Sequence, residues 1–164
     1  MNNYFMQLGF SFLCLTASLG MAHANIQKCT TAPLLVSSKN IGTVTYYADN
    51  CHQHWESQNI RLDFSYDQNI PEWAFKKAAS YYLKKNVSGF SNESVLNQIT
   101  ALYKPVKKGD LYSLDYNSIN QRLNLSLNQK VLGSITDRQA NQYFKIWFGS
   151  APFNAKLKQQ LLNQ

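Results

Sequence analysis

The sequence has few charged residues, and acidic ones are especially scarce. It contains 9 Asp and Glu against 16 Lys and Arg, which gives a net charge of +7 over 164 residues. Disordered chains are rich in charge and poor in aromatics, whereas here aromatics reach 13% and charged residues 15%. The polar share comes instead from 17 Asn and 13 Gln, which form no tract. These proportions indicate a compact globular protein.

The cations form no run of five or more. They occur as scattered pairs, such as Lys76–Lys77, Lys84–Lys85 and Lys107–Lys108. A nucleic-acid face gathers its cations in one patch or stripe. We therefore expect a solvated basic surface and no nucleic-acid partner.

Long hydrophobic runs are also absent. The longest, Leu8–Met21, is shorter than the roughly 20 residues of a membrane-spanning helix, and Ala22-His23-Ala24 follows it as an A-x-A cleavage pattern. We expect Met1–Ala24 to be a signal peptide and residues 25–164 to form a single domain. The protein would then be periplasmic or secreted, without stable membrane insertion after cleavage. The alternative is an uncleaved anchor, because Met1–Gln7 carries no Lys or Arg.

Cysteine is rare as well. Cys14 lies in the expected signal peptide, which leaves Cys29 and Cys51 in the mature chain. An even pair in an exported protein predicts a Cys29–Cys51 disulfide. The alternative is a metal site, because Cys51-His52-Gln53-His54 places a thiol and two imidazoles within four positions. The mature chain has no further histidine to complete such a site, so we expect the disulfide and no metal.

The order of the elements predicts an α+β domain with helices on one face of an antiparallel sheet. Ile60–Tyr66 alternates apolar and polar residues without a fault, as a half-buried strand does. Residues 25–40 are predicted to be irregular, with Pro33 breaking any strand. Further strands are expected at Ile41–Tyr47, Leu111–Tyr116, Arg122–Leu127 and Val131–Ile135. Helices are expected from an Asn69 cap to Lys85, over Ser91–Tyr103 and Asp137–Phe148, and from an Asn154 cap through Leu162.

The residues themselves show no catalytic constellation. The two mature histidines lie two positions apart, the carboxylates are scattered, and no glycine-rich phosphate loop occurs. We therefore assign no catalytic residue and no cofactor. Aromatic side chains recur at helical spacing, Trp73 and Tyr81 on one helix and Tyr143 and Trp147 on another. They are candidates for lining a ligand-binding cleft, and the alternative is that they belong to the plain core.

The C-terminal part of the sequence resembles the bacterial chalcone isomerase-like family. The resemblance is carried by an ordered set of short motifs: Lys107-Lys108-Gly109-Asp110, Leu114-Asp115-Tyr116, Leu132-Gly133-Ser134-Ile135, Ile146-Trp147-Phe148-Gly149 with Pro152, and Leu157-Lys158 with Leu161-Leu162. It implies an open, curved antiparallel sheet with helices layered against it and an apolar cleft between the layers.

The resemblance does not extend to the chemistry of the plant members. In those enzymes an arginine in an early strand stabilises the developing anion. The matching segment here, Cys29–Tyr47, contains no arginine. We therefore expect a non-catalytic binder of a small apolar or amphipathic, fatty-acid-like ligand. The alternatives are an isomerase or lyase that uses another residue, for which Arg61 is the candidate, and a structural envelope protein without a small ligand.

Overall fold

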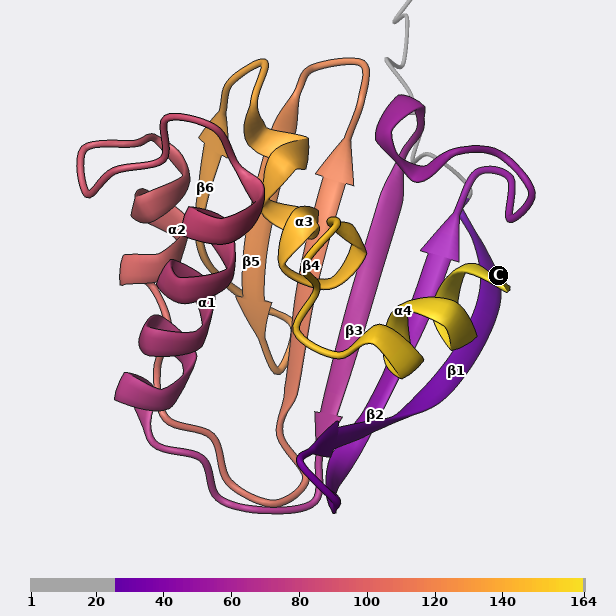
Figure 1. Ribbon diagram of the computed structural model, residues 1–164, viewed down its shortest axis with the longest axis vertical. Coiled ribbons are helices and arrows are strands. Elements are labelled where there is room, and N and C mark those ends of the chain that lie inside the picture. The colour runs from indigo at the N-terminus through magenta and orange to yellow at the C-terminus, as the bar shows by residue number, and fades with distance from the viewer. Residues whose placement is uncertain (1–25, 164) are drawn as a thin grey trace, which may run out of the picture.

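Six strands form one antiparallel sheet in which every strand pairs with the next along the chain (Figure 1). The structure, a computed structural model, describes residues 26–163, and the predicted signal peptide Met1–Ala24 lies outside them. In order, the strands are β1 (Gln27–Val36), β2 (Lys39–Ala48), β3 (Ile60–Tyr66), β4 (Leu111–Asn117), β5 (Arg122–Leu127) and β6 (Lys130–Thr136).

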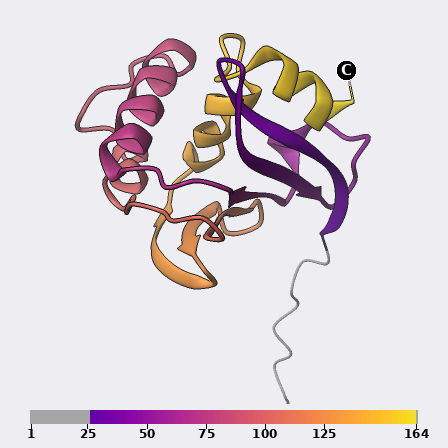
Figure 2. The ribbon, with the colours of Figure 1, turned by 90° about the horizontal axis from the view of Figure 1, so that it is seen from below.

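The helices lie together on one face of this sheet (Figures 1 and 2). They are α1 (Glu72–Asn86), α2 (Leu96–Ala101), α3 (Lys145–Phe148) and α4 (Ala155–Leu162), with short 3-10 turns η1 (Trp55–Ser57) and η2 (Ala140–Phe144). Seen from below, the β1–β2 hairpin curves up beside α4 toward the helix layer (Figure 2). This arrangement confirms the predicted α+β class and the curved sheet with helices on one face.

Strand β3 shows how the sequence pattern creates two different faces. Ile60, Leu62, Phe64 and Tyr66 are buried under the helices, while the residues between them are partly exposed on the opposite face. The neighbouring strand β4 alternates in the same way. Because side chains alternate along a strand, one face of the sheet supplies the core and the other meets solvent.

The prediction for residues 25–40 is wrong. Residues 27–40 form β1, the β1–β2 turn and the start of β2, and Pro33 lies within β1 opposite Thr43. Proline cannot donate to a strand ladder, and for that reason it is found in sheets mainly on edge strands, as β1 is.

Two of the expected helices are shorter or tighter than predicted. The segment expected over Ser91–Tyr103 is helical only at α2, and Asp137–Phe148 consists largely of the 3-10 turn η2 followed by α3. Asn69 does not cap α1, because its side chain accepts a hydrogen bond from the Lys108 N–H. Asn154 does cap α4, accepting from the Leu157 N–H at 2.9 Å.

Within residues 26–163, no helix has the length and apolar character needed to cross a membrane.

Candidate functional site

An apolar cavity of about 220 Å³ lies between the sheet and the helix layer. Side chains from β1 to β5, α1, α3 and the connecting loops line it, among them Leu34, Phe64, Tyr66, Ala78, Tyr103 and Trp147. Every lining residue is aliphatic or aromatic. The cavity is therefore suited to hydrocarbon or to a flat ring, whose burial contributes about 25 cal/mol per Å² of apolar area.

Small residues on α1 create part of this space. Ala74 and Ala78 lie one helical turn apart and both line the cavity, so no large side chain extends from this stripe of the helix. Larger rings close the walls around them. Phe75 stacks on Tyr103 at 5.2 Å between ring centroids, and Phe64 contacts Trp147 at 4.8 Å.

Hydrogen bonds from Asn86, the last residue of α1, connect this helix to the segment that follows α3. The Asn86 side chain donates to the carbonyl of Ala151 and accepts from its N–H, both at 2.8 Å. Gly149 permits this contact, because a Cβ there would collide with the Asn86 side-chain oxygen. The fastening places Phe153, which lines the cavity, against Tyr82 of α1. This side of the cavity is therefore held by a specific polar contact as well as by packing.

Three tyrosines supply the hydroxyl groups of the lining. Tyr112 donates to the Lys104 carbonyl at 2.8 Å and accepts from the Lys104 N–H. Tyr103 interacts with the hydroxyl of Tyr143, which in turn hydrogen-bonds to Thr100 at 3.0 Å. Burial raises the pKa of Tyr66, Tyr103 and Tyr143 well above that of free tyrosine, so their hydroxyls are neutral at physiological pH.

Trp147 and Tyr143 lie at or directly behind the cavity. Trp147 lines it. Tyr143 is fully buried with its ring centroid 6.5 Å from that of Trp147, but it is not part of the lining.

The predicted placement of Trp73 and Tyr81 is wrong. Both lie on the outer side of α1, 66% and 52% exposed, and neither lines the cavity. The helix carries aromatic residues on two adjacent stripes, and the stripe with the two alanines faces inward. Sequence reasoning missed Tyr66 and Phe64, although the alternation of Ile60–Tyr66 already places both on the buried face.

The arginine named in the enzyme alternative does not reach this cavity. Arg61 lies on the opposite face of the sheet, where its Nε is 3.2 Å from a carboxylate oxygen of Asp63 and its guanidinium stacks over Tyr47 at 4.2 Å. Asp115 lies beside it on β4, and burial raises the pKa of that carboxyl. The charges of the sheet are thus gathered on the face away from the helices.

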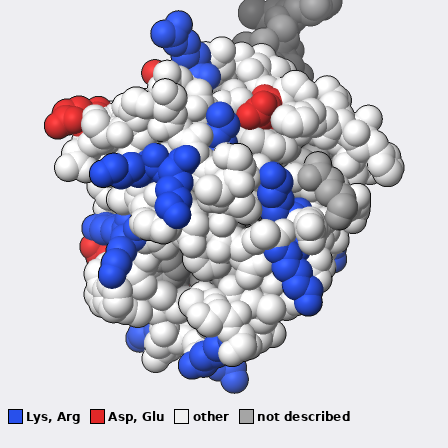
Figure 3. All heavy atoms as spheres, viewed as in Figure 1, with Lys and Arg blue, Asp and Glu red and all other residues white. Residues whose placement is uncertain are grey.

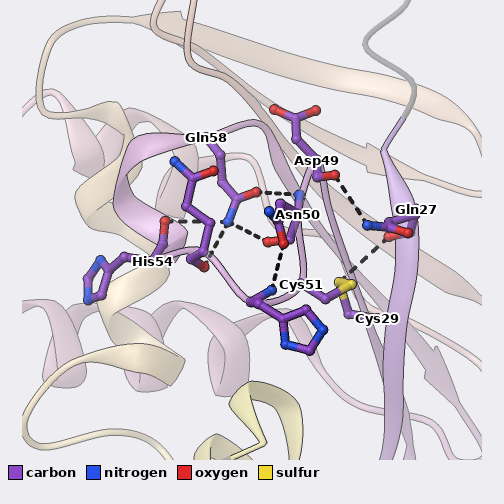
Figure 4. The surroundings of a disulfide bond; sticks show 9 residues. Gln27, Cys29, Asp49, Asn50, Cys51, His54 and Gln58 are labelled. Atoms are coloured by element: carbon purple, nitrogen blue, oxygen red, sulfur yellow. Dashed lines mark hydrogen bonds between the residues drawn. A yellow bond between two sulfur atoms is a disulfide. The ribbon is translucent and has the colours of Figure 1, made fainter.

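The predicted Cys29–Cys51 disulfide is confirmed. It joins β1 to the loop after β2, with 5.4 Å between the two Cα atoms (Figure 4). Because the bond occupies the Cys51 thiol, the metal alternative loses its sulfur ligand. Among the described residues, no group of three or more His, Cys, Asp and Glu side chains is placed to hold a metal ion.

A buried glutamine organises the loop that carries Cys51. The Gln58 amide donates to the carbonyls of Asn50 and Gln53, at 3.0 and 2.9 Å, and its oxygen accepts from the Asn50 N–H at 2.7 Å (Figure 4). The two histidines of this loop are exposed. The Cys-His-Gln-His segment is therefore shaped by hydrogen bonds to Gln58 and by the disulfide.

Comparison with known proteins gives a family and a related fold. No curated protein sequence matches this chain significantly. A solved structure of a fatty-acid binding protein from Arabidopsis thaliana matches with a TM-score of 0.64 and 17% identity, over 94% of this chain and 92% of the other. At this identity the match concerns the fold. The family model described as chalcone isomerase-like matches residues 44–163. These residues include β3 to β6 and all four helices, and the chain therefore belongs to the chalcone isomerase-like family.

Proposed function

We propose that this protein is a non-catalytic binder of a small apolar or amphipathic ligand, held in the cavity between sheet and helices. The observation that carries the proposal is the cavity itself, about 220 Å³ of space lined by aliphatic and aromatic side chains. Small-molecule sites are typically concave and lined mainly by apolar and aromatic side chains, as this one is. A small apolar molecule would bury its surface against these side chains.

The fold comparison supports a fatty-acid-like ligand. The Arabidopsis protein that shares this fold is named as a fatty-acid binding protein. An acyl chain is unbranched and apolar, and it suits a lining made of residues such as Leu34, Phe64 and Trp147. Lys and Arg side chains are spread over the helix-bearing face of the molecule, with few acidic ones between them (Figure 3). A charged head group left outside the cavity would meet a basic surface.

The lining does not favour the isomerase alternative. Stabilising a developing oxyanion requires a preorganised donor, and losing one such donor typically lowers the rate about a hundred- to thousandfold. No charged side chain lines the cavity, and Arg61 is engaged with Asp63 and Tyr47 on the other face. We expect chalcone cyclisation in the presence of the protein to proceed at the buffer rate.

Binding can be tested by filling the cavity from α1. Ala78→Phe places a ring into the space, whereas Lys77→Phe adds the same ring on the exposed side of the same helix. Decanoic acid and decanol are titrated into both variants and the wild type, followed by ¹H–¹⁵N NMR shifts. We expect the wild type and Lys77→Phe to bind alike and Ala78→Phe to lose about tenfold or more in affinity. Equal binding by all three proteins would contradict the proposed site.

We propose further that the protein works outside the cytoplasm. The disulfide supports this, because such bonds persist in oxidising compartments, and so does the expected signal peptide Met1–Ala24. N-terminal sequencing of the protein from its producing cell is expected to begin at Asn25. An intact Met1 on membrane-bound material would support the anchor alternative instead.

A further inference from the structure

The outer side of α1 presents only aromatic and lysine side chains to solvent. The exposed residues of the helix are Trp73, Lys77, Tyr81, Lys84 and Lys85. Among the described residues five large hydrophobic side chains are exposed, and the two aromatic ones, Trp73 and Tyr81, both lie here. Because residues four positions apart share one side of a helix, these five form a continuous surface, the aromatic–lysine face. Its two rings are about 12 Å apart along the helix axis, with Lys77 halfway between them.

The lysines of this helix are not neutralised by acidic side chains. Glu72 is the one acidic residue of α1, and it forms an ion pair with Lys76 one turn further along. Four lysines against one glutamate leave α1 with a net charge of +3. The Lys85 Nζ lies 4.6 Å from the centre of the Tyr81 ring, so charge and aromatic surface are in contact. Figure 3 shows basic side chains gathered on the left of the molecule, where Figure 1 places α1.

We propose that the aromatic–lysine face binds the surface of an anionic lipid bilayer, with α1 lying along the membrane plane. Trp and Tyr favour the membrane–water interface, because each combines an apolar ring with a polar group. Lysine extends a flexible apolar stem that lets its ammonium reach the phosphate groups of the lipids. The protein is then attached to the bilayer surface without crossing it.

The residue types favour lipid over a protein partner. Trp and Tyr are enriched at both kinds of interface, but lysine is depleted at protein–protein interfaces. Holding a long lysine side chain in one fixed contact costs conformational entropy, whereas a fluid bilayer offers many equivalent anionic groups. Three of the five exposed residues of α1 are lysines, which matches the composition of a lipid-binding face.

Docking through this face would hold the cavity close to the bilayer, because Ala74 and Ala78 on the same helix line it. The inference goes beyond the proposed function and does not depend on it. The affinity for a small molecule in solution is a property of the cavity lining, whereas the aromatic–lysine face decides where the protein resides. Each can therefore fail without the other.

The test is co-sedimentation of residues 25–164 with vesicles of mixed phosphatidylglycerol and phosphatidylcholine, and with vesicles of phosphatidylcholine alone. The aromatic variant is Trp73→Ala with Tyr81→Ala, and the charge variant is Lys84→Gln with Lys85→Gln. All four residues are exposed, so the changes should leave the fold intact, and thermal unfolding of each variant checks this.

Matched controls carry the same kinds of change elsewhere on the surface. Lys28→Gln with Lys156→Gln removes the same charge from exposed positions on β1 and α4, across the molecule from α1 (Figure 1). Ile119→Ala removes an apolar side chain that is 87% exposed in the turn after β4.

Tryptophan fluorescence gives a second measure of binding. The sequence has three Trp, and Trp55 and Trp147 are buried, so a change in emission on adding vesicles reports chiefly on Trp73. Insertion of the Trp73 ring into the membrane–water interface should shift the emission to shorter wavelength.

We expect the wild type to bind the anionic vesicles and to bind the phosphatidylcholine vesicles about tenfold or more weakly. Each lysine close to an anionic surface contributes about fivefold, so the charge variant should lose about tenfold or more in affinity. The aromatic variant should lose a similar factor, and both controls should stay within about twofold of the wild type.

Three results would overturn the inference, and each leaves the proposed function standing, because ligand titrations contain no vesicles. The first is a wild type that does not bind anionic vesicles, which would leave the face to a protein partner. The second is an equal loss in the charge variant and in its control, which would mean that net charge alone drives binding. The third is full binding by the aromatic variant.

Discussion

The two faces of strand β3 lie in different surroundings, one in the core under the helices and the other toward solvent. On the helix side Leu62, Phe64 and Tyr66 are buried among apolar neighbours, and no charged side chain lines the cavity that Phe64 and Tyr66 border. On the other side Arg61 and Asp63 compensate each other's charge 3.2 Å apart. The charged side chains of this strand thus lie on the face where solvent and an opposite charge can stabilise them. The covered face, left without charge, can accept only groups that need no counter-ion.

The largest expected effect comes from removing a core side chain on the covered face. Leu62→Ala should lower the free energy of unfolding by about 2–5 kcal/mol, because Leu62 is fully buried and its loss leaves a void. Ser65→Ala on the open face of the same strand is the control and should change it by less than about 0.5 kcal/mol. Urea titrations measure both, and similar losses in the two variants would erase the distinction between the faces.

Opening the disulfide should come next in size, because it secures the edge strand whose Leu34 borders the cavity. Cys29→Ser with Cys51→Ser frees a loop of about 22 residues, for a loss of about 3 kcal/mol. Thermal unfolding of the double variant and of the reduced wild type checks this. Intact mass of the untreated wild type should rise by two hydrogens on reduction. Full alkylation of both thiols without a reductant would show that the bond is absent.

A smaller effect is expected from the ion pair on the open face. Asp63→Ala leaves the Arg61 guanidinium without its carboxylate, and we expect a loss of about 1 kcal/mol, since the pair is only partly shielded from water. Arg61→Ala with Asp63→Ala removes both charges and should cost less than the sum of the two single changes. Additive losses in this double-mutant cycle would mean that the pair does not interact.

The smallest effect concerns Asp115. Burial raises the pKa of its carboxyl above the value in the unfolded chain. Folding therefore disfavours the ionised carboxylate. The folded state is most stable at low pH, where Asp115 is protonated, and it loses this stability as the pH rises through the pKa of Asp115 in the folded state. Asp115→Asn should be slightly more stable than the wild type at pH 7, and the difference should shrink as the pH falls toward the usual carboxyl range. Melting temperatures across this range test the sign, and a destabilised variant at pH 7 would contradict it.

Much of the fold follows from local sequence patterns. The alternation of Ile60–Tyr66 predicted both the strand and which side chains face the core, and Asn154 predicted the start of α4. The prediction at Pro33 was wrong because a strand can contain proline when it lies at the edge of a sheet. Local sequence patterns do not show which strand lies at the edge.

The candidate site was less predictable, because a cavity is a tertiary property. The inward stripe of α1 is set by the fit of Ala74 and Ala78 against distant residues such as Trp147, whereas Trp73 and Tyr81 have the stronger aromatic signal. Tyr66 did carry a readable signal, since a tyrosine on the buried side of an alternating strand must place its hydroxyl somewhere in the core.

The most direct test of a ligand-binding cavity is native mass spectrometry of protein purified gently from its producing cell. We expect a co-purifying small molecule that delipidation removes and that an apolar or amphipathic compound replaces in the wild type. Ala78→Phe, with its cavity filled, should carry none, while Lys77→Phe should carry as much as the wild type. Recovery of the wild type at its bare mass with no uptake of any apolar compound would contradict a binding role, and so would full retention of the molecule by Ala78→Phe.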